Sequence, residues 1–283
     1  MTTLRMDEYV IPAANMGEDD PLPMFREKEQ DDTVAFDDSV PAEDRRYKGW
    51  RTRFRVLPHR VQNGYDRARV PRAFKAAVLE NAFLRATFLP ELGGRLVSLF
   101  RKDLDREILA RNPVFQPANL ALRNAWFSGG IEWNTAQPGH HYLTCSSVHA
   151  VSVIGSDGLP FLRMYEYERT KCFPWQMDFH LPADSRVLFA HIRIRNPHDE
   201  EIPMYWWTNI AVPEVEGGRA VYPATTAVRP GKNGALELMH MPYAEGRDVS
   251  YSTNLPQAQE FFTRIPDGQR RWMAHVEPDG KGF

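Results

Sequence analysis

Apolar and polar side chains alternate with a period of two along much of this 283-residue chain. In residues 187–195, every second position from Leu188 to Ile194 is apolar, whereas His191 and Arg193 lie between them. This period is typical of antiparallel strands with one buried face and one wet face. Similar patterns predict strands within residues 77–90, 96–100, 148–154, 162–168, 176–181 and 203–212.

The segments between these patterns have the chemistry of turns. Gly93-Gly94 follows the first pattern and predicts a hairpin, and Ser156-Asp157-Gly158 and Asn196-Pro197 separate later ones. No convincing amphipathic helix of more than about ten residues is apparent. The sequence therefore predicts an all-β fold, in the form of a large antiparallel β-sandwich.

Composition and charge narrow the range of partners. Hydrophobic residues make up 42% of the chain, so it can bury a sizeable core, and the formal net charge of −2 disfavours nucleic acid and anionic membranes as partners. The two cysteines have no metal-ligand spacing, so neither a disulfide scaffold nor a zinc site is expected. The N-terminus lacks a signal-like apolar stretch, and a cytoplasmic location is expected.

The first 46 residues differ from the rest of the chain. They carry 13 acidic and 5 basic side chains, with several prolines and little periodicity. Such a segment cannot build its own core, so residues 1–46 are expected to form an acidic, proline-containing arm ahead of one domain over residues 47–283. Residues 47–75 carry 9 basic side chains and 1 acidic one, so charge complementarity allows the arm to lie against them.

Aromatic, glycine and polar residues are densest in residues 125–134, shortly before Gly139-His140-His141. Glu132 lies between two apolar residues, which predicts a raised pKa for its carboxyl group. Indole faces such as those of Trp126 and Trp133 can stack on a sugar ring, while carboxylate, amide and imidazole groups bind its hydroxyls. In the alternative interpretation, both tryptophans lie in the core and Glu132 is a paired surface carboxylate. The residues by themselves favour neither.

A second aromatic cluster lies in residues 204–209. Strand alternation places Tyr205, Trp207 and Asn209 on one face, and Trp206 on the other. An amide at the end of an aromatic stripe fits a ligand groove, and the alternative is a core stripe with Asn209 bonded to backbone.

Other patterns restrict the chemistry. Adjacent strand residues point in opposite directions, so at most one of His140 and His141 can serve a given site, and a dinuclear metal centre is disfavoured. Glu166 and Glu168 alternate with tyrosines and are expected on a solvated face. The motifs of serine hydrolases, P-loop enzymes and dinucleotide-binding enzymes are absent from the sequence, and no cofactor or metal ion is expected.

An ordered series of motifs resembles the domain-of-unknown-function 5107 family, from about Tyr9 to the last residue. The series comprises residues 79–95, Arg111-Asn112-Pro113, residues 128–134, Gly139-His140 and Trp207-Thr208-Asn209. Members of that family commonly carry the domain ahead of tetratricopeptide repeats, so such a region is expected in full-length relatives. The family is grouped with the galactose-mutarotase-like supersandwiches, which implies a broad sandwich that binds a sugar on its concave face.

The resemblance also implies roles for individual residues, and this sequence departs from the expected pattern at some of them. In mutarotase relatives a histidine follows the first strands and an Asn-His pair lies on a central strand. Here Gly139-His140-His141 resembles the first site, whereas Asn209 is followed by Ile210. Ring opening needs an acid and a base, so this departure weakens an aldose-epimerase interpretation.

The position of the C-terminus is a second departure. Residues 272–280 look like a strand and turn from the middle of the family domain. The resemblance therefore implies that several closing strands, with a late carboxylate, are absent. Three explanations are open: the chain is a fragment, a partner supplies the strands, or the fold is a reduced one.

Three functions follow from these patterns. In a carbohydrate-active enzyme, such as a glycoside hydrolase or an epimerase, Glu132 is the acid or base and Glu91 the only early candidate for a second carboxylate. In a non-catalytic carbohydrate-binding module, the tryptophans are stacking platforms, and in an assembly domain no ligand is bound. The predicted catalytic residues are Glu132, His140 and His141, and the predicted substrate-binding residues are Arg95, Trp126, Trp133, Asn134, Trp207 and Asn209.

Overall fold

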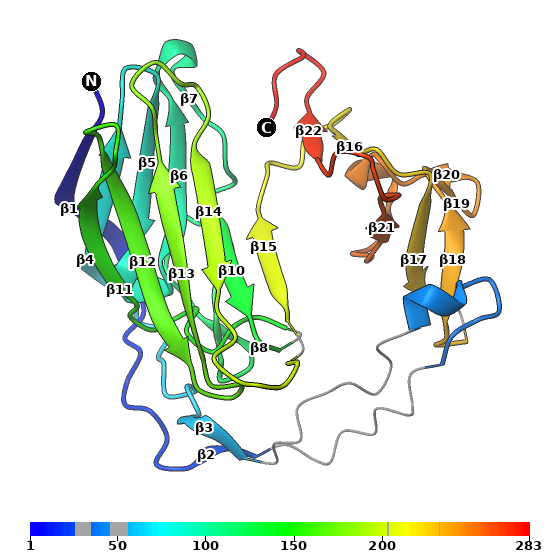
Figure 1. Cartoon of the computed structure of the whole chain (residues 1–283), viewed down its shortest axis with the longest axis horizontal. Coiled ribbons are helices and arrows are strands. Elements are labelled where there is room, and N and C mark those ends of the chain that lie inside the picture. The colour runs from blue at the N-terminus through cyan, green and yellow to red at the C-terminus, as the bar shows by residue number, and fades with distance from the viewer. Residues whose placement is uncertain (26–34, 46–55, 138, 203, 232) are drawn as a thin grey trace. The chain divides into compact units, whose positions relative to one another are not determined.

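The computed structural model describes residues 1–25, 35–45, 56–137, 139–202, 204–231 and 233–283 (Figure 1). The chain divides into two compact units. Unit 1 comprises Met1–Lys28 with Thr52–Ala211, and unit 2 comprises Glu29–Arg51 with Val212–Phe283.

Unit 1 consists of β-strands joined by turns and short 3-10 helices. The strands are β1 (Thr3–Ala13), β2 (Pro23–Phe25), β3 (Val56–Arg60), β4 (Val70–Glu80), β5 (Leu84–Leu89), β6 (Arg95–Arg101), β7 (Arg106–Glu107), β8 (Ala118–Ala121), β9 (Asn124–Trp126), β10 (Ile131–Thr135), β11 (His149–Ile154), β12 (Pro160–Glu168), β13 (Phe173–His180), β14 (Phe189–Ile194) and β15 (Trp206–Ile210). The 3-10 helices are η3 (Pro90–Leu92) and η4 (Lys102–Leu104).

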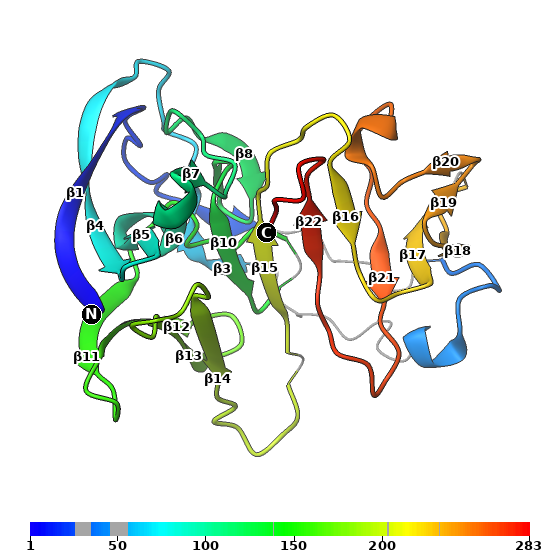
Figure 2. The ribbon, with the colours of Figure 1, turned by 90° about the horizontal axis from the view of Figure 1, so that it is seen from above.

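Two antiparallel sheets form the body of unit 1. The main sheet has the strand order β1-β4-β5-β6-β10-β15, with β7 beside β6, and the second sheet has the order β11-β12-β13-β14. Figure 2 shows β12, β13 and β14 on one side of the series of strands from β1 to β10. Apolar side chains from both sheets, among them Leu79, Phe88, Met177 and Phe179, form one buried cluster between them. The expected all-β antiparallel sandwich is therefore confirmed.

The main sheet also buries side chains on its outer face, which we define as the face turned away from β11–β14. Phe74, Val97, Phe115 and Phe127 belong to a second apolar cluster there. A β-bulge in β6 inserts Val97 between the residues that pair with Phe88 and Thr87 of β5. The outer face of this sheet carries the site described below.

The N-terminal segment contributes an edge strand to the main sheet. Residues 3–13, which the sequence placed in an acidic arm, form β1 and pair with β4 from Thr3↔Glu80 to Ala13↔Val70. Ile11 and Ala13 are buried in this way. A segment that cannot build a core of its own can still bury one face by pairing with a neighbouring strand.

The predicted strands are largely present, with one difference. The strand-like pattern in residues 77–90 is divided between β4 and β5 by a turn at Asn81. The side-chain oxygen of Asn81 accepts the N–H groups of Phe83 and Leu84, each at 2.8 Å. This side-chain turn needs neither glycine nor proline, so the apolar pattern runs through it. The expected hairpin across Gly93-Gly94 forms between β5 and β6.

Unit 2 is a smaller assembly of short strands around a buried cluster of Ala227, Met239, Ala244 and Val249. Its strands are β16 (Arg219–Val221), β17 (Thr226–Pro230), β18 (Leu236–His240), β19 (Tyr243–Ala244), β20 (Arg247–Asp248), β21 (Phe262–Arg264) and β22 (Ala274–Val276), with 3-10 helices η2 (Ala42–Arg45) and η5 (Ser252–Asn254). The strand expected within residues 272–280 is β22, which pairs with β16. Among the described residues of the whole chain, no helix has the length and apolar character to span a membrane.

Candidate functional site

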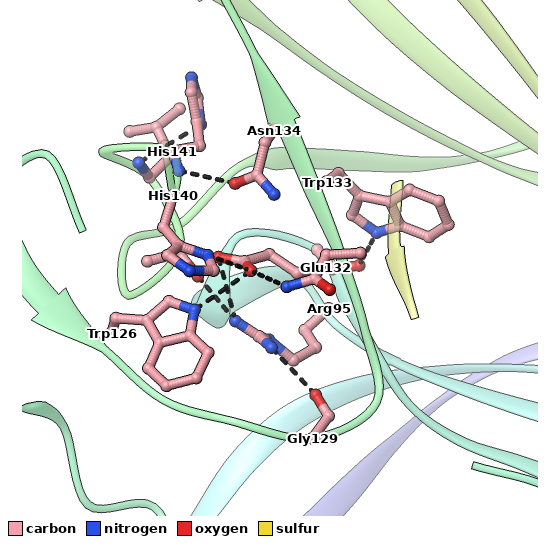
Figure 3. Close-up of polar contacts among 12 residues, drawn as sticks. Arg95, Trp126, Gly129, Glu132, Trp133, Asn134, His140 and His141 are labelled. Carbon is pink, nitrogen blue, oxygen red and sulfur yellow. Dashed lines mark hydrogen bonds and ion pairs between the residues drawn. The ribbon is translucent and has the colours of Figure 1, made fainter. Parts of the chain in front are cut away.

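The site is built around Glu132 in β10, whose side chain is 3% exposed. In the main sheet, β10 lies between β6 and β15, and Glu132 pairs directly with Asn209 of β15. Strand alternation separates Glu132 from its neighbour Trp133, as Figure 3 shows. The Trp133 indole belongs to the core between the sheets and donates to the carbonyl of Gly94 at 3.0 Å.

Five side chains meet the Glu132 carboxylate. Its Oε2 accepts from Trp126 Nε1 at 3.1 Å and Asn209 Nδ2 at 3.2 Å, and lies 2.8 Å from His140 Nδ1. Its Oε1 accepts from Thr144 Oγ1 at 2.7 Å and lies 3.5 Å from Arg95 Nη2. A carboxylate offers about four lone-pair positions, so these contacts saturate it.

These contacts set the protonation state of Glu132. Burial by itself would raise the pKa of Glu132, but the hydrogen bond to His140 and the charge of Arg95 outweigh it and lower the pKa to about 2. The raised pKa expected for Glu132 is therefore wrong, because the hydrogen bond to His140 and the charge of Arg95 outweigh the effect of burial. With this pKa, Glu132 is ionised near neutral pH.

Arg95 lies beneath the carboxylate and is itself buried. It donates to the carbonyl of Gly129 at 2.9 Å and to Thr144 Oγ1 at 2.7 Å, and its guanidinium lies 4.0 Å from the ring centroid of Phe127. The backbone at Gly130 passes close to β6, and this approach requires glycine: Gly130 has a φ of +68°, and a Cβ there would lie 2.3 Å from the carbonyl oxygen of Leu96. Through its contacts with Thr144 and Glu132, the buried Arg95 holds the carboxylate in place.

His140 faces outward from the site. Its side chain is 16% exposed, and its ring centroid lies 4.7 Å from that of Trp126 and 5.7 Å from that of Trp207. Glu132 holds Nδ1, and among the described residues Nε2 has no hydrogen-bond partner. A carboxylate at Nδ1 favours the tautomer that carries its proton there, which leaves the Nε2 lone pair for a ligand.

His141 occupies a different environment. It is buried, with its ring centroid 4.1 Å from that of Tyr142 and 6.1 Å from that of Trp175. Burial lowers the pKa of His141 to about 3. Its backbone N–H donates to Asn134 Oδ1 at 2.6 Å, and Asn134 is fully buried. Neither side chain is thus presented to solvent.

The strand β15 presents one face to the site, in agreement with the predicted alternation. Asn209 reaches Glu132, and Trp207 is 38% exposed beside His140. Trp206 lies on the opposite side against the core, with its ring centroid 6.3 Å from that of Trp175. The side-chain amide of Asn209 thus bonds to the Glu132 carboxylate, and not to backbone as in the alternative interpretation.

The predicted residues are thus divided between two environments. One group is joined by direct contacts around the Glu132 carboxylate and His140: Arg95, Trp126, Glu132, His140, Trp207 and Asn209. The other predicted residues, Trp133, Asn134 and His141, are buried and make none of these contacts. Glu91 accepts the backbone N–H of Lys75 at 2.8 Å, and no contact among the described residues joins it to Glu132.

One residue of the cluster was not singled out from the sequence. Thr144 bonds both Arg95 and Glu132, but a lone threonine in a loop carries no recognisable signal. Within the part of the chain that the structure describes, no three His, Cys, Asp or Glu side chains are grouped so that they could hold a metal ion.

The fold and this cluster define an all-β domain with a carboxylate–imidazole pair on the outer face of its main sheet. Residues 53–260 match the family model described as a domain of unknown function (DUF5107), and the chain belongs to this family. The family membership expected from the motif series is therefore confirmed.

A solved structure shares the fold. The crystal structure of a TPR-domain containing protein from Parabacteroides distasonis matches 99% of this chain with a TM-score of 0.75 and 17% sequence identity. The match covers 43% of that protein, so this chain spans less than half of its length.

Proposed function

We propose that unit 1 binds a carbohydrate at the Glu132–His140 site. The observation that carries the proposal is the 2.8 Å contact between Glu132 Oε2 and His140 Nδ1, which holds an outward imidazole beside Trp207. Sugars present apolar CH faces and hydroxyl groups to a protein. An exposed indole suits the first and the Nε2 atom of His140 suits the second.

The proposal gives the buried groups a supporting role. Glu132 fixes the orientation and tautomer of His140, and Arg95 and Thr144 hold Glu132 in turn. Imidazole is the side chain that most readily carries a proton near neutral pH. His140 is therefore the proposed proton carrier if the bound sugar is turned over.

Glycoside hydrolysis is the less favoured chemistry at this site. It requires a second carboxylate about 5 to 9.5 Å from the first, with one of the two carboxyl groups able to give up a proton. Glu132 is ionised and saturated, and Glu91 is engaged by Lys75. A proton transfer by His140, or binding without turnover, agrees better with these contacts.

A non-catalytic carbohydrate-binding domain is the second candidate. This candidate is favoured because all the hydrogen-bonding positions of the Glu132 carboxylate are occupied by protein groups, and a binding domain needs no acid and base pair. The TPR-domain neighbour supports the further proposal that the domain acts alongside tetratricopeptide repeats within a longer protein. The grouping of this family with the galactose-mutarotase-like proteins, which the motif resemblance implies, favours a sugar as the ligand in either case.

Sugar binding to the whole chain tests the proposal. We expect a thermal shift with one or a few members of a panel of mono- and oligosaccharides, because a ligand of the folded state raises its apparent stability. Trp207→Ala should weaken that binding by about 1 to 3 kcal/mol, measured by calorimetry. Trp272, which is also exposed but belongs to unit 2, provides the matched control Trp272→Ala.

Two further outcomes decide between the candidates. Equal sugar affinity in Trp207→Ala and Trp272→Ala, or a folded chain with no response to any sugar, would contradict the proposed site. With a sugar identified, loss of turnover but retained binding in His140→Gln would indicate an enzyme.

A further inference from the structure

A second polar site lies on the outer face of the main sheet, at its β1 end. A hollow of about 260 Å³ opens there above β1, β4, β5 and β6. Its lining includes three arginines (Arg5, Arg85 and Arg111), two hydroxyl residues (Thr87 and Ser98) and two acidic residues (Asp7 and Glu8). We propose that this hollow binds an oxyanion, that is, a phosphate, sulfate or carboxylate group of a small ligand. The proposal is independent of the carbohydrate site.

The hollow follows from the sizes of the side chains on neighbouring strands. One row across the sheet runs Arg5↔Val78, Val78↔Thr87 and Thr87↔Ser98. The next outward residue of β4 is Ala76, which is also small. Short side chains on the middle strands, between long arginines, leave a depression in the sheet surface.

The acidic groups near the hollow are engaged by protein partners. Asp7 lies 3.5 Å from Arg5 Nε and accepts the backbone N–H of Glu8 at 2.9 Å. Glu80 pairs with Arg5 at 2.6 Å and with Lys102. Glu8 also lines the hollow, although alternation along β1 directs its side chain to the face opposite that of Arg5 and Asp7. Most of the negative charge at the rim is therefore neutralised.

Glu107 is engaged in the same way. It accepts from Ser98 Oγ at 2.6 Å and from the backbone N–H of Leu99 at 2.8 Å. Its distance of 3.7 Å from Arg111 Nη1 is too long for a hydrogen bond. Arg111 therefore keeps most of its N–H donors.

Two guanidinium groups of the lining have donors to spare. Arg111 donates to the hydroxyl of Tyr9 at 2.7 Å, which uses one of its five N–H groups. Arg85 rests on the ring of Phe100, 4.9 Å from its centroid, and has no hydrogen bond or ion pair among the described residues. Contact with a ring face leaves the N–H edge of a guanidinium open.

The floor of the hollow adds a hydroxyl. Thr87 is two residues from Arg85 in β5 and lies on the same face. Its hydroxyl has no protein partner within the described part of the chain. Two guanidinium forks with uncommitted donors and one hydroxyl match the acceptor oxygens of an oxyanion, since arginine forms paired bonds with such groups.

An NMR titration of the whole chain with inorganic phosphate, sulfate and acetate in turn tests the proposal. We expect saturable shift changes in the backbone amides of β1 and β5. Arg85→Gln and Arg111→Gln should each weaken binding roughly tenfold, and Arg85→Lys should weaken it less because the charge remains. The control is Arg193→Gln, an exposed arginine of β14.

The outcomes are distinct. Saturable binding of phosphate and sulfate identifies a tetrahedral oxyanion as the occupant, and binding of acetate alone identifies a carboxylate. Either result supports the site when Arg85→Gln and Arg111→Gln weaken the binding. Unchanged amides of β1 and β5, or equal affinity in the double variant Arg85→Gln/Arg111→Gln and in Arg193→Gln, would overturn it. Trp207→Ala should retain phosphate binding, so failure of the carbohydrate proposal would leave this result unaffected.

Discussion

At the scale of single residues, the environment of Glu132 decides what the site can do. The local sequence surrounds it with apolar residues, but in a strand those neighbours point to the opposite face. Its carboxylate meets Trp126, His140, Thr144, Arg95 and Asn209 instead. The carboxylate therefore positions His140, and the imidazole is left to meet a ligand.

Glu132→Gln tests this role through stability. The substitution leaves Arg95, whose side chain is 3% exposed, as a buried charge without its counter-ion. We expect a loss of roughly 3 to 5 kcal/mol in the free energy of unfolding, measured by urea denaturation. Glu237→Gln, which removes a half-exposed partner of Arg229, should change it much less. Equal effects would show that the buried pair has no special importance.

Two buried histidines contribute to the pH dependence of stability. Burial lowers the pKa values of His59 and His141 from 6.5 to about 3. As the pH falls below about 6.5, the unfolded chain takes up protons that the folded chain excludes, so stability is lost progressively down to about pH 3. The slope for His141 should reach about 1.4 kcal/mol per pH unit.

Chemical denaturation between pH 7 and pH 4 measures this slope. His59→Gln and His141→Gln should each make it shallower, whereas the control His240→Gln, at an exposed position of unit 2, should not. Below about pH 4.5 a further loss is expected as Glu132, with its pKa of about 2, resists protonation in the folded state. A stability that is constant from pH 7 to pH 4 would contradict both assignments.

At the scale of elements, alternation predicted the strands well and the turns between them less well. β11 to β15 lie where a period of two placed them, and β12 and β13 bury apolar residues in the core between the sheets. The turn at Asn81 was missed because a side-chain amide, rather than glycine or proline, closes it. Glu168, expected on a solvated face, is buried and bonded to Tyr142 and Thr170.

Asn81→Ala tests the turn between β4 and β5. Its amide nitrogen also donates to the carbonyl oxygens of Pro182 and Ser185, each at 2.8 Å, so the substitution leaves buried backbone groups unpaired. We expect a loss of about 1 to 3 kcal/mol in the free energy of unfolding, measured in guanidinium chloride. Asn254→Ala, at an exposed amide in unit 2, should have little effect. A similar loss in both variants would argue against the turn as the cause.

At the scale of the whole molecule, pairing between distant segments assembles the site. β10 and β15 are neighbours in the sheet, so Glu132 meets Asn209 across 77 positions of sequence. Alternation predicts on which face of its own strand each residue lies. It does not predict that β10 and β15 are neighbours in the sheet. The motif series indicated the family, and the family match confirms that inference.

The sequence by itself determined the all-β class, the strand faces and the residue types around Glu132, because these depend on side-chain periodicity and composition. Only the tertiary structure decided which residues share a site. It turned Trp133, Asn134 and His141 into the interior, saturated Glu132 and left His140 facing outward. The pKa of a carboxyl group depends on charges and donors brought from distant segments, and the order of residues along one strand does not reveal them.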